Sequence, residues 1–181
     1  EIPSSVTKIG NGAFGWCSNL TSIEIPSSVT SIGNKAFYYT PDLESIVVEG
    51  GNTNYDSRSN CNAIIETQTN TLLYGCKNTV IPNSVTSIGN DAFYYCTNLT
   101  GIEIPSSVTS IGNYVFANCS NLTSVKCQAE IVPETEETAF DNCPSDMNIQ
   151  VPEAAVSLYK ATSPWNNYNV TKMYPYQNGD Y

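Results

Sequence analysis

The sequence predicts a β-rich solenoid, in which coils of similar length stack into a rod. One motif, EIPSSVTSIGN at 103–113, recurs with small changes at residues 1, 24 and 80. Aligned at a period of 23 residues, four segments agree at most positions: 1–23, 24–46, 80–102 and 103–125. Apolar residues also return at fixed places in every copy. Self-similarity at such a period is the signature of a repeat architecture.

The apolar places are the second, sixth, ninth, fourteenth, twentieth and last of each copy. In the copy at 103–125 they are occupied by Ile104, Val108, Ile111, Phe116, Leu122 and Val125. We expect all of them to point inward. Coils stacked about 4.8 Å apart would then place each residue above its equivalent and make one continuous core.

Each coil is expected to contain two short strands and one turn. TSIEI at 21–25 alternates apolar and polar residues as a half-buried strand does, and Pro26 ends it. SVTSIG supplies the second strand, and NxAFxxC, which is too short for a regular helix, a helical or 3₁₀ turn with the core Phe. Glycine recurs after the second strand at Gly10, Gly33, Gly89 and Gly112. We expect a backbone conformation there that a Cβ would make costly.

Residues 47–79 break the pattern and are longer than one period. Within them, CNAIIETQTNTLLYGC places two apolar runs around TQTN, which predicts a β-hairpin that extends or bulges the coil. A turn centred on Gln68 and Thr69 would set Cys61 opposite Cys76. A cross-strand disulfide between them is one outcome, and two buried thiols are the alternative.

The repeat decays after residue 125, and we expect 126–172 to form a degenerate repeat and a cap. VPEAAVSLYKATSPW predicts a helix from 151 to about 162, with Pro152 in its first turn. Trp165, Tyr168 and Val170 are expected to complete the cap, so that the solenoid spans 1–172 and 173–181 form a loose tail. No comparable cap precedes Glu1, which favours a fragment of a longer array.

Composition argues against several functions. A net charge of -10 disfavours nucleic acid and anionic membranes, and no apolar run is long enough to cross a bilayer. The seven cysteines form no CxxC pair and histidine is absent, so we expect no metal or other cofactor and no Ser-His or Cys-His catalytic pair. We therefore expect no enzyme. A β-helix enzyme acting on polysaccharides is a minor alternative.

The repeats, read as IPSSVTSIGNxAFxxCxNLTSI, resemble those of the BspA-like leucine-rich-repeat family of bacterial surface proteins. The insertion CNAIIETQTNTLLYGCKNTVIP and the ending VPEAAVSLYKATSPW also resemble modules of Bacteroidetes members. The resemblance covers residues 1 to about 172, and Thr40 departs from the usual Cys. It implies a leucine-rich-repeat array on a secreted or surface-anchored protein. Adhesion to host matrix proteins or to other bacteria is the role it suggests, and no site residues carry over.

Variation between copies indicates where a partner could bind. The fifteenth and sixteenth places hold Trp16, Tyr38, Tyr39, Tyr94 and Tyr95. Because Trp and Tyr are enriched at binding hot spots, these five are our candidate patch for a host or bacterial surface protein or a glycan. The alternative is that half of them only shield the core.

A second candidate surface is the outward strand face, at Ser22, Glu24, Ser45, Gly101, Glu103 and Ser124. Its alternative is a sheet face that only keeps the protein soluble, since Val47, Val80 and Lys126 interrupt the column. For the whole chain, a purely structural role as a stalk or spacer that presents other domains is the rival function.

Overall fold

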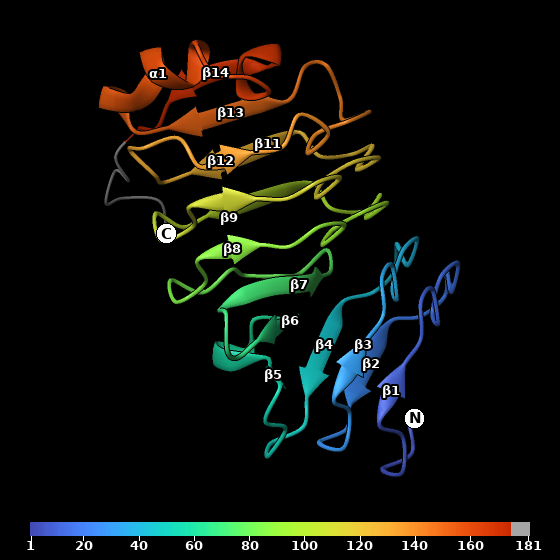
Figure 1. The fold of residues 1–181 in the computed structure, drawn as a ribbon. Coiled ribbons are helices and arrows are strands. Elements are labelled where there is room, and N and C mark those ends of the chain that lie inside the picture. The colour runs from blue at the N-terminus through green and yellow to red at the C-terminus, as the bar shows by residue number, and fades with distance from the viewer. Residues whose placement is uncertain (175–181) are drawn as a thin grey trace, which may run out of the picture.

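The chain winds into a stack of coils with short strands on two sides, in a computed structural model that describes residues 1–174 (Figure 1). The strands on one side are β1 (Lys8–Ile9), β3 (Ser31–Ile32), β8 (Ser87–Ile88), β10 (Ser110–Ile111) and β12 (Glu134–Thr135). The other side has β2 (Ser22–Ile25), β4 (Ser45–Val48), β9 (Gly101–Ile104), β11 (Ser124–Cys127), β13 (Asn148–Val151) and β14 (Asn169–Lys172). The predicted β-rich solenoid is confirmed.

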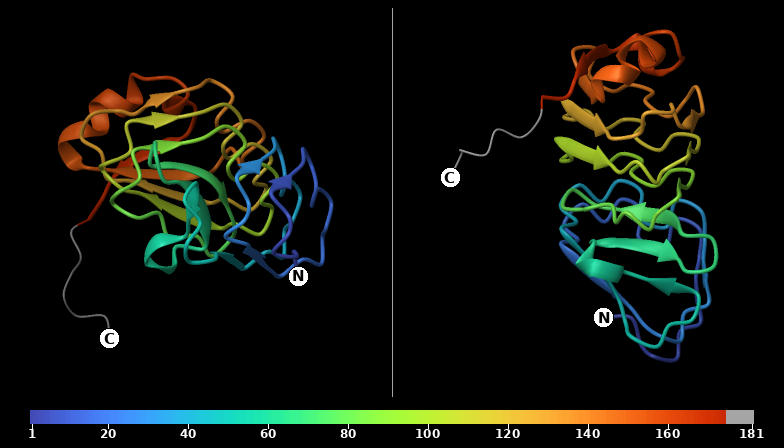
Figure 2. Two further views of the ribbon diagram at one scale, coloured as in Figure 1. Left: turned by 60° about the horizontal axis from the view of Figure 1, so that its bottom comes forward. Right: turned by 90° about the vertical axis from the view of Figure 1, so that its left-hand side faces the viewer.

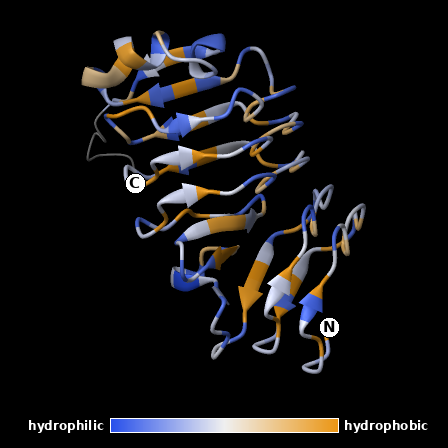
Figure 3. Cartoon of the chain, viewed as in Figure 1, coloured by the Kyte–Doolittle hydropathy of each residue, from blue (hydrophilic) through white to orange (hydrophobic). Residues whose placement is uncertain are grey.

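Equivalent residues of successive coils pair in parallel register. Ile23 pairs with Ile46 in the β2–β4 ladder, and Ile102 pairs with Val125 in the β9–β11 ladder. Residues in β2 and β9 alternate between exposed and buried, as TSIEI predicted. Figure 3 shows the resulting alternation of polar and apolar positions along the strands. The apolar positions therefore meet inside the stack.

The segment between the two strands of a coil forms successive hydrogen-bonded turns. Some of its N–H groups donate to the next coil, as Phe14 does to the carbonyl of Ala36 at 2.8 Å. Others donate within the turn, as Gly15 does to Gly12 at 2.8 Å. The predicted helical or 3₁₀ turn is therefore a series of single turns and not a regular helix, because half of its backbone N–H groups donate to the neighbouring coil.

The reason that we expected for the recurrent glycines is wrong. Gly10, Gly33, Gly89 and Gly112 lie outside the left-handed region. A Cβ on Gly33 would instead lie 2.4 Å from Oδ1 of Asn11 and 2.5 Å from its backbone nitrogen. Close packing on the preceding coil therefore explains Gly33 and, in the same way, Gly112, whereas a Cβ on Gly10 would meet nothing within 4 Å.

The insertion forms a hairpin that separates two cores. It contains β5 (Tyr55–Asp56), the 3₁₀ turn η1 (Arg58–Asn60), and the hairpin strands β6 (Ala63–Glu66) and β7 (Thr71–Gly75). β6 lies against β4, while β7 pairs in parallel with β8. Ile64 and Tyr74 belong to the N-terminal core, whereas Ile65 and Leu72 belong to the C-terminal core. The two stacks lie on either side of this hairpin, at an angle to each other (Figures 1 and 2).

The hairpin register differs from the one that the proposed disulfide needs. Leu72 faces Ile65 as expected, but a bulge then sets Tyr74 opposite Ile64 and Gly75 opposite Ala63. Cys61 and Cys76 are therefore out of register, and both are free thiols. The Cys76 thiol contacts the carbonyl of Asn62 at 3.4 Å instead. Of the two outcomes considered, the structure contains the buried thiols.

The C-terminal end of the stack is covered by a cap, seen at the top of Figure 1. It consists of η2 (Glu153–Ala155), the predicted helix α1 (Val156–Lys160), η3 (Trp165–Asn167) and β14. Trp165 is fully buried, packs against Phe140 at a centroid distance of 5.2 Å, and donates from Nε1 to Oγ1 of Thr135. Of the predicted tail, residues 175–181 lie outside the described residues.

Candidate binding surface

Aromatic side chains join the turns of successive coils into one cluster. Trp16 lies 4.3 Å from Tyr39 between ring centroids and 5.8 Å from Tyr38. Tyr39 contacts Tyr95 at 5.6 Å, and Tyr95 contacts Tyr94 at 4.8 Å. The structure thus brings together all five residues of the candidate patch, which we call the aromatic ladder.

The ladder crosses the insertion without a gap. The turn of the second coil meets the turn of the 80–102 coil directly, because the hairpin between them contributes no turn at this edge. Nδ2 of Asn98 donates to Oδ1 of Asp42 at 3.1 Å, and Lys77 pairs with Glu44 at 2.8 Å. The first contact joins the two stacks, and the second joins the N-terminal stack to the end of the insertion.

Exposure differs between members of the aromatic ladder. Trp16 has 61% of its surface open to solvent, whereas the four tyrosines are half-buried. Tyr38 lies against the turn at Gly15, where a Cβ would lie 2.1 Å from Cε1 of its ring. Tyr38 therefore fits the shielding role that we considered as the alternative. Trp16 does not fit that role, since most of its surface faces water.

Three ladder residues adopt a backbone conformation that suits other residue types. Trp16, Tyr39 and Tyr95 have φ angles of 63°, 54° and 59°. The equivalent residues of later coils are Asn118 and Asn142, with φ angles of 61° and 57°. Asn tolerates this left-handed region, whereas other side chains with a Cβ lose roughly 1–2 kcal/mol there. The backbone conformation of the turn therefore does not explain why aromatic residues occupy this place.

The structure adds neighbours that the sequence analysis missed. Tyr114, 41% exposed, lies 6.2 Å from Tyr94 between ring centroids. Nζ of Lys35 lies 4.5 Å above the Tyr94 ring and 3.7 Å from Oδ1 of Asp91, whose pKa is raised by burial. Lys35, Asp91 and Tyr114 all occupy the twelfth place of their repeats, so comparing that place between copies would have found them.

The outward strand face, our second candidate surface, is divided between two separate sheets. Ser22, Glu24 and Ser45 lie on the β2–β4 sheet, while Gly101, Glu103 and Ser124 lie on the separate sheet β14-β13-β11-β9. Ser45 and Ser124 are half-buried and the other four are exposed. The second sheet borders an open groove of 630 Å³, which Glu103, Lys126, Gln150 and Pro152 help to line. Nε2 of Gln128, also in its lining, donates to Oε1 of Glu103.

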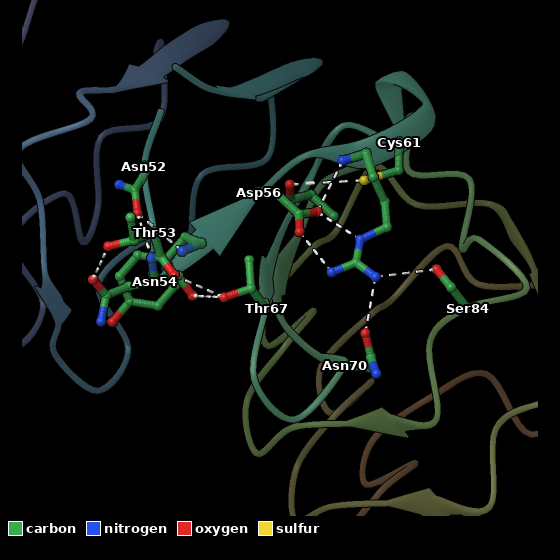
Figure 4. A network of polar contacts seen from close by, with 11 residues as sticks. Asn52, Thr53, Asn54, Asp56, Cys61, Thr67, Asn70 and Ser84 are labelled. Carbon is green, nitrogen blue, oxygen red and sulfur yellow. Dashed lines mark hydrogen bonds and ion pairs between the residues drawn. The ribbon is translucent and has the colours of Figure 1, made fainter. Parts of the chain in front are cut away.

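Arg58 forms its polar contacts with other residues of the chain, and its partners Asp56, Asn70 and Ser84 are labelled in Figure 4. Its Nε and Nη2 donate to the two carboxylate oxygens of Asp56 at 2.7 and 2.6 Å, and this pairing raises the pKa of Arg58. Nη1 donates to Asn70 at 2.8 Å and to Ser84 at 3.4 Å. The guanidinium thus ties the hairpin turn to the next coil.

The chain offers little material for catalysis or metal binding in its described part. Burial raises the pKa of Cys96 and of Cys143 to about 12, which keeps both thiols protonated and weakly nucleophilic. Within residues 1–174, no group of three or more His, Cys, Asp or Glu side chains could hold a metal ion. In the same range, no helix has the length and apolarity that a membrane crossing requires.

The fold defines a leucine-rich-repeat solenoid, a class of proteins that typically serve as repeat-based binding scaffolds. The chain belongs to the BspA-type leucine-rich-repeat family, whose model "BspA type Leucine rich repeat region" matches residues 1–73 and 65–170 in six copies. The resemblance noted in the sequence is therefore confirmed. A comparison with curated proteins found no match.

Solved structures of bacterial leucine-rich-repeat proteins are similar to this chain. A leucine-rich cell surface protein from Faecalibacterium prausnitzii is 25% identical, with a TM-score of 0.57 over 96% of this chain and 53% of that one. A leucine-rich-repeat protein from Eubacterium ventriosum is 27% identical, with a TM-score of 0.56 over 85% and 48%. The pneumococcal vaccine antigen PcpA shares the fold, at 16% identity and a TM-score of 0.61 over 83% and 44%. The chain thus spans about half the length of these proteins.

Proposed function

We propose that the chain is a non-enzymatic scaffold on a secreted or surface-anchored bacterial protein, and that it binds a surface protein or a glycan through the aromatic ladder. One observation carries this proposal. Three ladder aromatics occupy left-handed positions that Asn fills in later coils, so the turn alone gives no reason for them. Strain of this kind concentrates at functional sites.

The extracellular location is supported by the family and by the similar cell surface protein from Faecalibacterium prausnitzii. Adhesion to host matrix proteins or to other bacteria is the role that we favour. The ladder is suited to such contacts because Trp and Tyr provide large contact areas with few rotatable bonds.

Capture on immobilised matrix proteins, bacterial cells and glycans tests the proposal. The test variant is the triple substitution Trp16→Asn, Tyr39→Asn and Tyr95→Asn, because Asn suits the left-handed backbone where Ala would not. We expect specific capture by the wild type and at least about tenfold weaker capture by the triple variant. The matched control is Ile131→Asn, since Ile131 is 83% exposed and lies outside the ladder.

A stalk that only presents other domains is the rival function. It is favoured by the continuous parallel ladders, which make each stack stiff, and it requires no energetic patch on the surface. Capture of equal strength by wild type and triple variant, or no specific capture at all, would support the stalk and contradict our proposal.

A further inference from the structure

We propose that the column formed by Trp16, Tyr39, Tyr95 and Asn118, at the sixteenth place of their repeats, and by Asn142, their equivalent in the degenerate repeat, is a binding site for an extended neutral glycan. This inference rests on the proposed function and names the ligand class. We call these residues the left-handed column because their φ angles, in chain order, are 63°, 54°, 59°, 61° and 57°.

The column changes chemistry along its length. Its first three members present aromatic rings, linked at centroid distances of 4.3 and 5.6 Å. Its last two members present amides, and Nδ2 of Asn142 donates to Oδ1 of Asn118 at 3.1 Å. The five residues come from successive turns, two from the N-terminal stack and three from the C-terminal one, so the groups follow one another across the junction between the stacks. A linear ligand that follows the column would meet rings first and amides next.

Sugars match both halves of the column. The C–H faces of a pyranose ring are apolar and lie flat on aromatic rings, while its hydroxyl groups pair with a group that both donates and accepts. An amide is such a group. Within residues 1–174, the bond between Asn142 and Asn118 leaves the NH₂ of Asn118 and the carbonyl oxygen of Asn142 without a hydrogen-bond partner. They are therefore available to a hydroxyl.

Charge favours a neutral ligand. None of the five column residues is charged, although the chain as a whole carries a net charge of -10. An acidic polysaccharide would be repelled by this overall charge and would find no cation in the column. Lys35 lies nearby but is already engaged over the Tyr94 ring and beside Asp91. A protein partner would be expected to use a rim of charged and polar contacts, which the column itself does not provide.

Trp16 provides an optical readout of binding. The chain has two tryptophans. Trp165 is fully buried, whereas Trp16 is 61% exposed, so acrylamide should quench mainly Trp16. A glycan that stacks on the indole should reduce this quenching, and the dependence on glycan concentration then gives an affinity.

The experiment uses the whole chain on an array of linear neutral glycans, including β-glucan, mannan and xylan oligosaccharides, with acidic polysaccharides and deglycosylated matrix proteins as further arms. The strongest neutral ligand is then titrated against acrylamide quenching. We expect binding that is insensitive to salt and at least about tenfold weaker in the triple Asn variant of the three aromatics. The thermal unfolding midpoint of that variant should stay well above the assay temperature, because Asn fits the same left-handed backbone, so the weaker binding would not result from unfolding.

The amide half has its own test. The double variant Asn118→Gly and Asn142→Gly keeps the left-handed backbone and removes both amides. We expect it to weaken glycan binding while leaving acrylamide access to Trp16 in the free protein unchanged. Asn60→Gly is the matched control, because Asn60 is also left-handed, with φ 53°, but lies in η1 outside the column.

The remaining outcomes separate the two proposals. Binding of a protein through the aromatic ladder, with no neutral glycan bound, would overturn the glycan assignment and leave the proposed function standing. Binding only to acidic polysaccharides, weakened by salt, would also overturn the assignment. Neutral glycan binding that survives in the triple Asn variant would overturn the column as a site and the ladder as the binding surface.

Discussion

At the scale of single residues, the phenylalanines of the fourteenth place, together with Phe140 of the degenerate repeat, form the centre of each stack. Phe14 stacks on Phe37 at 5.2 Å between centroids, and Phe116 stacks on Phe93 at 5.3 Å and on Phe140 at 5.5 Å. The two series are interrupted where β7 passes between them. Each Phe therefore couples its coil to the next one of the same stack.

We predict that Phe116→Ala lowers the free energy of unfolding by about 3–5 kcal/mol, because it leaves a cavity between two packed rings. Urea unfolding monitored by circular dichroism measures this loss. Phe14→Ala is the matched control and should cost less, since Phe14 is half-buried and has one ring neighbour. A cost for Phe116→Ala below about 1 kcal/mol would contradict its central position.

Gly112 tests the packing reason for the recurrent glycine. A Cβ there would lie 2.4 Å from Oδ1 of Asn90 and 2.9 Å from the backbone nitrogen of that residue. We predict that Gly112→Ala destabilises the fold by about 1–3 kcal/mol through overpacking. Gly10→Ala, whose Cβ would meet nothing within 4 Å, should be close to neutral in the same urea assay. Equal costs at the two positions would contradict a packing role.

At the scale of elements, the hairpin β6–β7 is the part that gives the chain two cores instead of one. Tyr74 anchors it in the N-terminal stack: its hydroxyl donates to the carbonyl of Gly33 at 2.5 Å and accepts from the N–H of Ala36 at 3.4 Å. Its ring also lies 5.3 Å from that of Phe37 between centroids. The hairpin thus lies against the N-terminal stack where a regular third coil would otherwise pack.

We predict that Tyr74→Phe costs about 1–2 kcal/mol, because the partly buried carbonyl of Gly33 loses its hydroxyl donor while the ring packing stays. Hydrogen exchange should quicken in β3 and β4 and stay unchanged in β9 to β13. Tyr38→Phe is the control, since Tyr38 is half-buried at the surface of the turn. Faster exchange throughout the chain would show that the hairpin does not act locally.

The sequence could predict the regular elements but not what the hairpin does. Alternation in TSIEI located β2, and Pro152 with the apolar face after it located α1. The bulge between Ile64 and Ile65 was not predictable, because it depends on how the hairpin fits two cores. For the same reason, the contact between Tyr39 and Tyr95 could not be read from the sequence. The five aromatics were found from variation at two neighbouring places of the repeat, whereas the left-handed backbone of Trp16, Tyr39 and Tyr95 was not predicted.

At the scale of the whole molecule, the two stacks differ in size and in how their ends are covered. The C-terminal core is the larger and is closed by the cap around Trp165. The N-terminal core is smaller, and its first coil keeps Phe14, Leu20 and Ile2 only partly buried. In a solenoid, stability is a sum of coil and interface contributions, so a smaller stack opens at lower denaturant.

We therefore predict that this chain unfolds in two steps, with the N-terminal stack first. Trp165 emission reports the C-terminal stack when Trp16 is replaced by Asn. A fluorophore on Cys17, the exposed cysteine of the described chain, reports the N-terminal stack. The midpoint in urea should be lower for the Cys17 probe than for Trp165, because Cys17 lies in the stack with the smaller core.

The Tyr74→Phe variant tests whether the hairpin couples the unfolding of the N-terminal stack to that of the C-terminal stack. The hairpin contributes residues to both cores, so the folded C-terminal stack should stabilise the N-terminal stack through it. Weakening its hold on Gly33 should then lower the Cys17 midpoint and leave the Trp165 midpoint in place, which widens the gap. Coincident midpoints in both proteins would instead mean that the hairpin couples the cores into one cooperative unit. In that case the angle between the stacks would be fixed, and the aromatic ladder across their junction would be rigid before any ligand binds.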